Sequence, residues 1–241
     1  VYKRQSVNNI PIIIFDRPNP NSHYVDGPIL NLENKSFVGL HPVPVVYGLT
    51  IGEYAKMING ENWLGSNKKA DLTVIRLKNY DRYEIYELPI PPSPNLPNSK
   101  AINLYPSLCL FEGTGVSVGR GTNLQFQIYG SPDLNKKTNK FRFTPKKNIG
   151  SKYPKNENKI CFGKDLRSEK SLDEINLNYI IDAYNDSSNK TNFFNSYFIK
   201  LSGNKNLKNN IILGKKNDDI KKEWKKGIDR FKKLRKKYFL Y

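Results

Sequence analysis

The sequence predicts an α/β fold in two parts, on three observations. The first third has the pattern of strand, helix and strand, a proline-rich segment follows, and the last third is patterned as helices. Of the 241 residues, 37% are hydrophobic and 12% aromatic, which is enough to form a buried core. We therefore expect a folded protein of one or two domains.

The first predicted strand is the apolar run at 11–15, which is rich in β-branched residues and is followed by prolines. A run without polar residues is typical of a parallel strand buried on both faces. Thr50 and Glu53 have the spacing of a capping box, which predicts a helix that Gly60 ends. A second strand at 71–77 completes a strand–helix–strand unit, and this order predicts an α/β domain.

A domain boundary is predicted at the proline-rich segment 88–97, which must be extended because closely spaced prolines exclude helix. We place the two domains at 1–92 and 93–241. Glycines recur in 105–129 and predict short strands joined by tight loops. A polar loop follows, with a strand expected at 140–144.

Three helices are predicted in the last third of the chain. Capping-box spacing at 171–174 predicts a helix that ends near Tyr184, and aromatic residues at helical spacing in 192–201 predict another that Gly203 stops. The longest helix is expected at 218–238, with an apolar stripe toward the core and lysines toward solvent. The stripe consists of Ile220, Trp224, Ile228, Phe231, Leu234 and Tyr238.

The chain begins without an initiator methionine, a signal peptide or a transit peptide, and it opens almost directly into the first predicted strand. We therefore expect that an upstream part of the protein is missing. Residues 1–5 fit the sequence that follows poorly, and the predicted fold leaves them out.

Composition excludes several classes of protein. The two cysteines, Cys109 and Cys161, are too few for a disulfide-dense scaffold and form no C-x-x-C motif. The aliphatic run at 10–15 is too short to span a bilayer, so we expect no membrane span. His23 and His41 lie apart, without a pattern of cysteine or carboxylate ligands, so we expect no metal and no other cofactor.

The chain is strongly basic, because 40 lysines and arginines against 22 aspartates and glutamates give a net charge of +18. Such a charge suits a protein that binds nucleic acid or another anionic polymer. The alternative is that an AT-rich genome enriches lysine and asparagine, and that the lysines cover solvated helix faces. We favour this alternative and expect no nucleic-acid partner.

The densest cluster of residues suited to catalysis surrounds Glu112, which follows the apolar stretch 108–111 and precedes a glycine-rich run. At the end of an apolar strand, desolvation favours the protonated carboxyl group that a general acid needs. The glycines allow a ligand to approach the backbone, and Arg120 can hold a carboxylate. The alternative is a tight turn that a Glu112–Arg120 ion pair stabilises, and spacing alone does not decide.

A second cluster, Asp16, Arg17 and Asn19, follows the first predicted strand, at the position where α/β proteins place their ligands. Its alternative is a turn that ends the strand. Glu53 is also a candidate site residue, although its capping box explains it as well. His41 is a candidate for contact with substrate.

Taken in order along the chain, these clusters resemble the motifs of the NamZ-type exo-β-N-acetylmuramidase family. The likeness extends from about residue 12 to residue 241, and the tail from Trp224 is similar to the Bacteroidota-like form of the family. The ordered set of motifs carries the resemblance, rather than any single one. The motifs are FDRPNP at 15–20, VDGP at 25–28, SFVGLHP at 36–42, GLTIGE at 48–53, PSPN at 92–95, YP at 105–106, FEGT at 111–114 and GRGT at 119–122.

The resemblance implies the last part of a Rossmann-like N-terminal domain, followed by an α+β C-terminal domain, with the active site in a cleft between them. Members of the family remove N-acetylmuramic acid (MurNAc) from non-reducing ends of peptidoglycan fragments, which implies a periplasmic or secreted location. One of the family's two catalytic glutamates corresponds to Glu112, and the other lies upstream of this chain. The implied substrate contacts are Asp16, Arg17, Asn19, His41, Glu53, Thr114 and Arg120.

The sequence departs from the family pattern at three positions. Gly115 stands where the family usually has Asn, which removes a hydrogen bond to substrate, and Tyr47 and Leu49 replace His and Met. Because the upstream glutamate is absent, we expect the chain alone to be inactive.

We predict a glycoside hydrolase, an exo-β-N-acetylmuramidase that releases MurNAc from MurNAc–GlcNAc fragments in cell-wall turnover or recycling. Glu112 is expected to be the proton donor or its partner, since glycoside hydrolysis usually takes two carboxylates. Arg17 and Arg120 are both candidates for binding the lactyl carboxylate of MurNAc. The alternative is a basic module without catalysis that binds an anionic polymer, peptidoglycan or nucleic acid.

Overall fold

The computed structural model describes residues 2–65 and 68–241 and combines short strands with helices. The helices are α1 (Tyr2–Val7), α2 (Ile51–Gly60), α3 (Ser99–Leu108), α4 (Asn178–Asp186), α5 (Tyr197–Ser202), α6 (Lys205–Ile212) and α7 (Asn217–Arg235). The strands are β1 (Ile12–Phe15), β2 (Asp26–Ile29), β3 (Pro44–Val46), β4 (Leu72–Ile75), β5 (Ile128–Ser131), β6 (Phe141–Phe143) and β7 (Cys161–Asp165). Short 3-10 helices are η1 (Leu32–Asn34), η2 (Cys109–Gly113) and η3 (Lys236–Tyr238).

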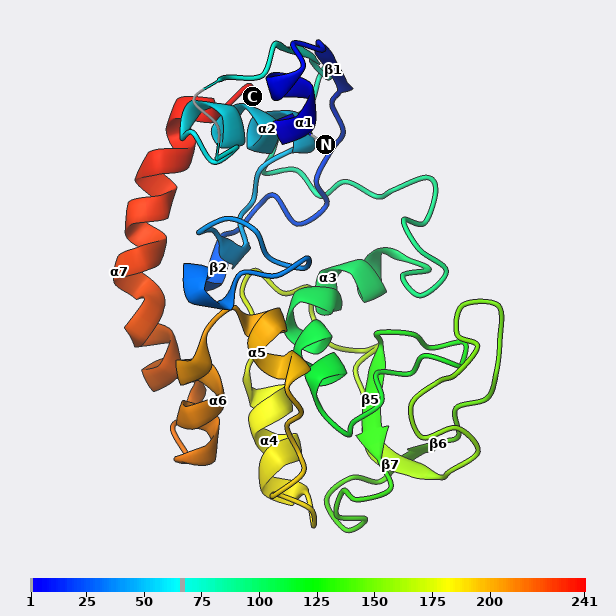
Figure 1. The fold of residues 1–241 in the computed structure, drawn as a ribbon. Coiled ribbons are helices and arrows are strands. Elements are labelled where there is room, and N and C mark those ends of the chain that lie inside the picture. Colours follow the sequence, from blue (N-terminus) through cyan, green and yellow to red (C-terminus); the bar gives the residue numbers. More distant parts are fainter. Residues whose placement is uncertain (1, 66–67) are drawn as a thin grey trace.

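The strands of the described residues form three small sheets, which confirms a mixed fold of helices and strands. β1 pairs with β4 in parallel, so that Ile12 lies opposite Leu72. β2 and β3 are antiparallel, and β7 lies between β5 and β6 in an antiparallel sheet of three strands. In Figure 1, α1, α2 and β1 lie at the top, while α3 to α6 and β5 to β7 lie at the bottom.

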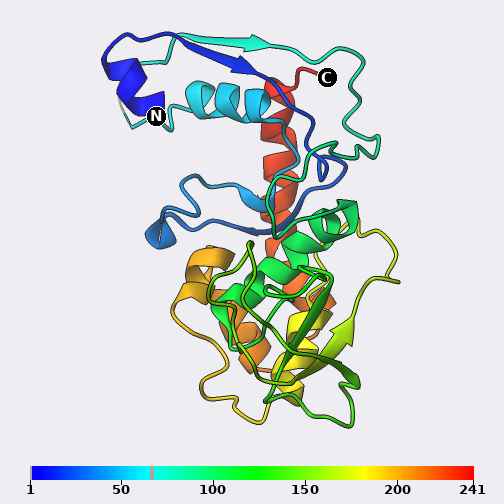
Figure 2. The same ribbon diagram turned by 90° about the vertical axis from the view of Figure 1, so that its right-hand side faces the viewer.

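Helix α7 joins these upper and lower parts. It runs along one side of the molecule from α6 to α2, and the rotated view in Figure 2 shows the same course. Its predicted stripe is confirmed: Ile220 lies in the large lower core, and Ile228 and Phe231 pack with Leu49 and Met57 in a second cluster. None of the helices in the described part of the chain is long and apolar enough to cross a membrane.

A buried polar network fixes the last residues of the chain to the start of α2. The predicted capping box is present: the Thr50 hydroxyl accepts from the Glu53 amide, and the Glu53 carboxylate accepts from the Thr50 amide at 3.0 Å. Glu53 is fully buried and also accepts from Arg82 and from the Leu240 amide at 2.8 Å. Arg82 in turn donates to the main-chain oxygen of Tyr241. Three distant segments therefore meet at one carboxylate.

The expectation that β1 is buried on both faces is wrong within the described chain. Ile12 and Ile14 are buried against α2, whereas Ile13 and Phe15 are 63% and 74% exposed. The alternation of burial is that of a strand with one covered face, because the helix that packs on this two-stranded sheet lies on one side only.

Two further expectations are wrong, one about the first residues of the chain and one about the stretch before Glu112. Residues 2–5, which the predicted fold left out, belong to α1, and Tyr2 packs on the cluster that contains Ile12. The stretch that precedes Glu112 is not a strand but the end of α3 followed by η2. α3 begins at Ser99, where the Asn98 side chain caps it by accepting from the Ala101 amide at 2.9 Å.

The capping box predicted at 171–174 does not form. The amides of residues 172, 175 and 176 donate to side chains of distant segments instead of to a helix turn. Their acceptors are, in order, Asn103, Asp26 and Ser107. α4 consequently begins only at Asn178.

The helix predicted at 192–201 begins later, at Tyr197. The residues before it make contacts with the segment around Glu112, because the Asn195 amide donates to the Gly113 carbonyl. Gly203 ends the helix as predicted, with a φ of 64° that favours glycine.

We predict that Arg82→Met lowers the free energy of unfolding by about 3–5 kcal/mol, because it leaves the Glu53 carboxylate buried without its cation. The loss is a large part of the roughly 5–15 kcal/mol that stabilises a typical domain. Urea unfolding measures it, with the exposed Arg76→Met as the control. Equal stability of the two variants would contradict the role given to this ion pair.

Candidate functional site

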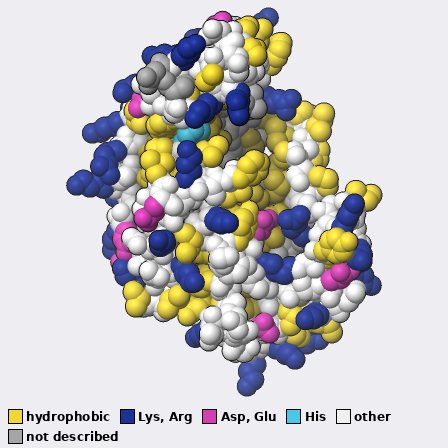
Figure 3. All heavy atoms as spheres, viewed as in Figure 1, with side chains coloured by type: hydrophobic (Ala, Val, Ile, Leu, Met, Phe, Trp, Pro, Cys, Tyr) yellow, Lys and Arg dark blue, Asp and Glu magenta, His cyan; other side chains and the backbone are white. Residues whose placement is uncertain are grey.

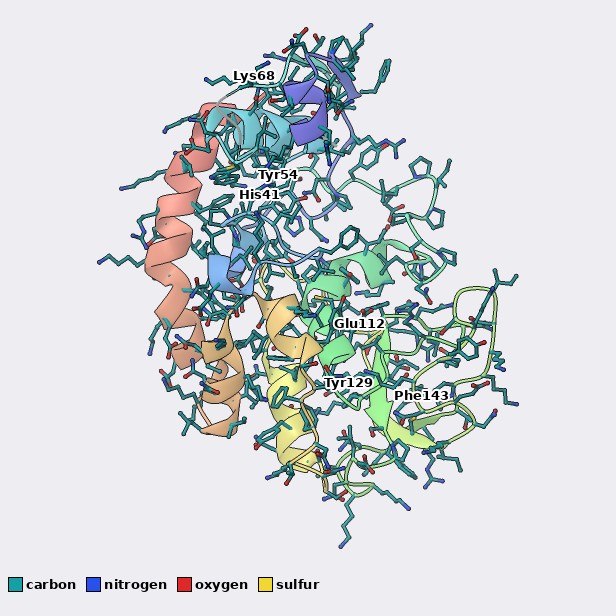
Figure 4. The ribbon with its side chains drawn as sticks, in the orientation of Figure 1. His41, Tyr54, Lys68, Glu112, Tyr129 and Phe143 are labelled. Atoms are coloured by element: carbon teal, nitrogen blue, oxygen red, sulfur yellow. The ribbon has the colours of Figure 1, made fainter. Side chains whose placement is uncertain are left out.

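Glu112 lies at the end of η2, in the lower half of the molecule (Figure 4). Its side chain is 28% exposed, and its Oε1 lies 3.5 Å from Nη1 of Arg120, whose side chain is 41% exposed. The Glu112–Arg120 ion pair of the alternative interpretation, a turn that this pair stabilises, is therefore present. It is open to solvent on one side, as a group that meets a ligand must be.

The backbone around Glu112 is held from the side of α5. Gly113 lies against the backbone of Phe198, where a Cβ atom has no room. The Asn195 amide donates to the Gly113 carbonyl at 3.0 Å, and the Gly115 amide donates to the Phe193 carbonyl at 3.2 Å. These contacts fix the turn, so that the direction of the Glu112 side chain is set by the fold.

Lys155 holds the same turn by its main-chain carbonyl groups. Its ammonium donates to the carbonyls of Phe111 and Glu112, at 3.0 and 3.4 Å, and to that of Thr114. The next residue, Asn156, donates to the Gly115 carbonyl. Burial lowers the pKa of Lys155 to about 8, with Glu112 opposing and Arg120 reinforcing the shift. A cation with a lowered pKa thus lies against the backbone of Glu112.

A large pocket of about 1030 Å³ opens between α2 and the segment that holds Glu112. Figure 3 shows hydrophobic side chains gathered around a hollow in this face, with a histidine at its edge. His41 stacks on Trp63, with ring centroids 5.2 Å apart, and its Nδ1 lies 2.9 Å from the Tyr54 hydroxyl. Burial, and secondarily Lys35, lower the pKa of His41, which favours the neutral ring. Aromatic walls of this kind suit the faces of sugar rings.

A second pocket, of about 240 Å³, adjoins the large one. Glu112 and Tyr197 line both pockets, so they stand where the two meet. The small pocket also contains charged and polar groups, whereas the large one is mainly apolar. Its other lining residues are Val116, Ser117, Val118, Arg120, Ser151, Tyr153 and Lys155.

Asp16, Asn19 and Glu53 lie away from this junction and line neither pocket. Asp16 is buried and accepts from the Thr50 hydroxyl at 2.7 Å, the Gly52 amide at 2.8 Å and the Tyr241 hydroxyl at 3.0 Å. Asn19 donates to the Leu49 carbonyl. These bonds, with those of Glu53, hold the first part of the chain together.

The predicted site residues therefore divide into two groups. Glu112 and Arg120 meet at the pockets, and His41 lies across the large pocket from Glu112 (Figure 4). Thr114 is buried beside Glu112 and donates to the Phe111 carbonyl, and Arg17 is exposed. Sequence reasoning missed other lining residues, since Lys155 lies in a polar loop and no local pattern links it to Glu112. The missed residues are Tyr54, Trp63, Tyr153, Lys155 and Tyr197.

Both cysteines are free thiols, and Cys109 lines the large pocket. Cys109 and Cys161 are both buried and do not pair with each other. Within residues 2–65 and 68–241, no three histidine, cysteine, aspartate or glutamate side chains are grouped to hold a metal ion. Among the groups that line the two pockets are the carboxylate of Glu112, the guanidinium of Arg120 and aromatic side chains.

The fold and the site define a two-part α/β protein with a carboxylate and an arginine at the junction of two pockets. The family model described as exo-β-N-acetylmuramidase NamZ, N-terminal, matches residues 1–100, and the C-terminal model of the same family matches residues 103–241. The chain belongs to the NamZ exo-β-N-acetylmuramidase family.

Individual relatives agree with this assignment. The chain is 34% identical to the peptidoglycan β-N-acetylmuramidase NamZ of Bacillus subtilis (strain 168), over 97% of this chain and 60% of that protein. It thus spans about three fifths of that relative's length. A DUF1343 family protein from Bacteroides fragilis NCTC 9343, known from a crystal structure, has 48% sequence identity to this chain. The two structures superpose with a TM-score of 0.96, over 100% of this chain and 69% of that one. A second such protein from this strain, 24% identical with a TM-score of 0.76, shares the fold over 100% of this chain and 68% of its own.

The pKa of Lys155 leads to a prediction on stability. Burial makes the charged amine unfavourable in the folded protein, and this cost is fully present below pH about 8. Between about 8 and the ordinary value of 10.5 the unfolded chain binds more protons, so the cost decreases as pH rises. Urea unfolding should show the parent gaining stability relative to Lys155→Met across this interval. A stability difference that stays constant with pH would contradict the lowered pKa.

Two glycines of the Glu112 turn are expected to differ in their tolerance of a side chain. A Cβ at Gly115 meets nothing within 4 Å, so Gly115→Asn should change the free energy of unfolding by less than about 0.5 kcal/mol. A Cβ at Gly113 overlaps the backbone of Phe198, so Gly113→Ala should cost roughly 1–3 kcal/mol. Thermal unfolding of both variants tests this, and the reverse order would show that the turn is not held as described.

Proposed function

We propose that this chain is part of a peptidoglycan exo-β-N-acetylmuramidase, which hydrolyses terminal MurNAc from the non-reducing end of MurNAc–GlcNAc fragments. The observation that carries the proposal is the position of Glu112. Its side chain is partly exposed, lies at the junction of two pockets and is paired with Arg120. Membership of the NamZ family and the 34% identity to the Bacillus subtilis enzyme support it. The substrates are peptidoglycan-derived saccharides.

In the proposed mechanism, Glu112 acts on the glycosidic bond as the proton donor or as its partner. Hydrolysis of this bond usually takes two carboxylates, one on each side of the reacting carbon. We infer that the second comes from the sequence upstream of residue 1, as the family resemblance implies. Arg120 keeps a positive charge beside Glu112, and Lys155 fixes the backbone from which Glu112 projects.

We also infer the finer architecture and the location. Residues 1–92 are proposed to be the last part of a Rossmann-like domain, residues 93–241 a C-terminal α+β domain, and the large pocket part of the cleft between them. The parallel pairing of β1 and β4 beside α2 supports the first of these. Because peptidoglycan lies outside the cytoplasm, we propose a periplasmic or secreted protein.

The proposal predicts that Glu112→Gln abolishes the release of MurNAc from MurNAc–GlcNAc. The glutamine amide can serve neither as the proton donor nor as the second carboxylate of the catalytic pair. A loss of at least about a hundredfold is expected, since acid–base catalysis contributes roughly 10²–10⁴ to the rate. The assay measures free MurNAc released by a full-length protein that spans its relatives' whole length. Glu169→Gln, which changes an exposed carboxylate, is the matched control and should keep full activity.

Two outcomes would contradict the proposal. If the folded parent releases no MurNAc, it is not this hydrolase, and retained binding of peptidoglycan at low salt would favour a basic binding module. If Glu112→Gln keeps the parent's rate, the enzyme is a muramidase whose chemistry lies elsewhere.

A further inference from the structure

Arg120 has donor groups that the protein does not use. Its Nη1 lies 3.5 Å from the Glu112 carboxylate, a long ion pair, and the side chain is 41% exposed. Its Nε is buried, and no group in residues 2–65 or 68–241 accepts a hydrogen bond from it. The exposed part of the guanidinium, rather than the buried Nε, is what a ligand in the pocket can reach.

The small pocket that Arg120 lines has an excess of positive charge. Arg120 and Lys155 are its two cations, and Glu112 is its one carboxylate among the described residues. The Lys155 ammonium is engaged by three carbonyl oxygens, so it contributes charge to the pocket rather than a free donor. Of the two cations, Arg120 is therefore the one that can bind an anion directly, and its planar fork matches a carboxylate.

The size of the small pocket indicates what it holds. Its volume of about 240 Å³ is below the roughly 300–1,000 Å³ typical of sites that hold drug-sized ligands, whereas the large pocket has about 1030 Å³. A single sugar substituent suits the small pocket, and an extended saccharide suits the large one. Glu112 lies between them and reaches both.

We propose that the small pocket is an anion subsite in which Arg120 binds the lactyl carboxylate of the sugar whose bond is cleaved. The assignment rests on the proposed function, because MurNAc differs from N-acetylglucosamine by that lactyl group. The assignment chooses between Arg17 and Arg120, the two candidates that the sequence offers for binding the lactyl carboxylate. Arg17 is exposed and lines neither pocket that Glu112 lines, whereas Arg120 lines the small one. The subsite makes Arg120 a specificity residue for carboxylate-bearing sugars.

The test compares the binding of MurNAc with that of the same sugar carrying a neutral amide in place of its carboxylate. Titration calorimetry or NMR on the full-length protein gives the ratio of the two dissociation constants. The parent should bind MurNAc at least about tenfold more tightly, since a hydrogen bond between two charged groups is stronger than one to a neutral amide. Arg120→Gln should bring this ratio close to one, by weakening only the binding of MurNAc.

Other variants separate the causes. Arg120→Lys keeps the charge without the fork and should retain part of the preference, whereas Arg230→Gln, an exposed change on α7, should retain all of it. The thermal unfolding midpoint of each variant shows that a lost preference does not come from unfolding.

The inference is overturned if the parent does not prefer the carboxylate, or if Arg120→Gln keeps the preference. It is also overturned if Arg17→Gln removes the preference and Arg120→Gln does not. Because the readout is binding, a protein that prefers the carboxylate but releases no MurNAc would support the subsite while contradicting the proposed hydrolysis.

Discussion

The arrangement of the upper and lower parts of the molecule depends on the hydrogen bonds and the ion pair made by the buried carboxylate of Glu53. It accepts from the start of α2, from Arg82 and from the Leu240 amide, so that the end of the chain is fixed beside a helix that begins about 190 residues earlier. The helix α7 that precedes this end also packs on the lower core through Ile220. Since α2 and the loop after it carry Tyr54 and Trp63, the same contact positions one wall of the large pocket over Glu112.

Two glutamates in similar sequence surroundings have different positions in this fold. Both lie in short motifs that contain glycine, and the sequence makes both of them candidates. Glu53 is fully buried, and protein donors occupy its oxygens, so it stabilises the structure. Glu112 is partly exposed, and Arg120 at 3.5 Å leaves it open toward two pockets. Burial and the number of partners separate the two groups, and neither property can be seen in a motif.

The elements that the sequence predicted well depend on local signals. The capping box at Thr50 and the glycine at 203 act within a few residues, the apolar stripe of α7 is a periodic pattern within one helix, and each is confirmed. The failures come from distant partners. The amides at 172, 175 and 176 bind side chains of other segments, and β7, for which the sequence predicted no strand, pairs with β5 and β6. At the site, Glu112 and Arg120 were predictable from a short glycine-rich run, whereas Lys155 reaches the turn from 43 residues away.

The most direct test of this account is a crystal structure of the full-length protein carrying Glu112→Gln, with the disaccharide MurNAc–GlcNAc bound. The account predicts that the glycosidic oxygen lies within hydrogen-bond distance, roughly 2.6–3.2 Å, of the side chain at position 112. It also predicts that the disaccharide occupies the junction of the two pockets, with its carboxylate toward Arg120. A disaccharide whose glycosidic bond lies away from this junction would contradict the central claim, that Glu112 acts on the bond where the pockets meet.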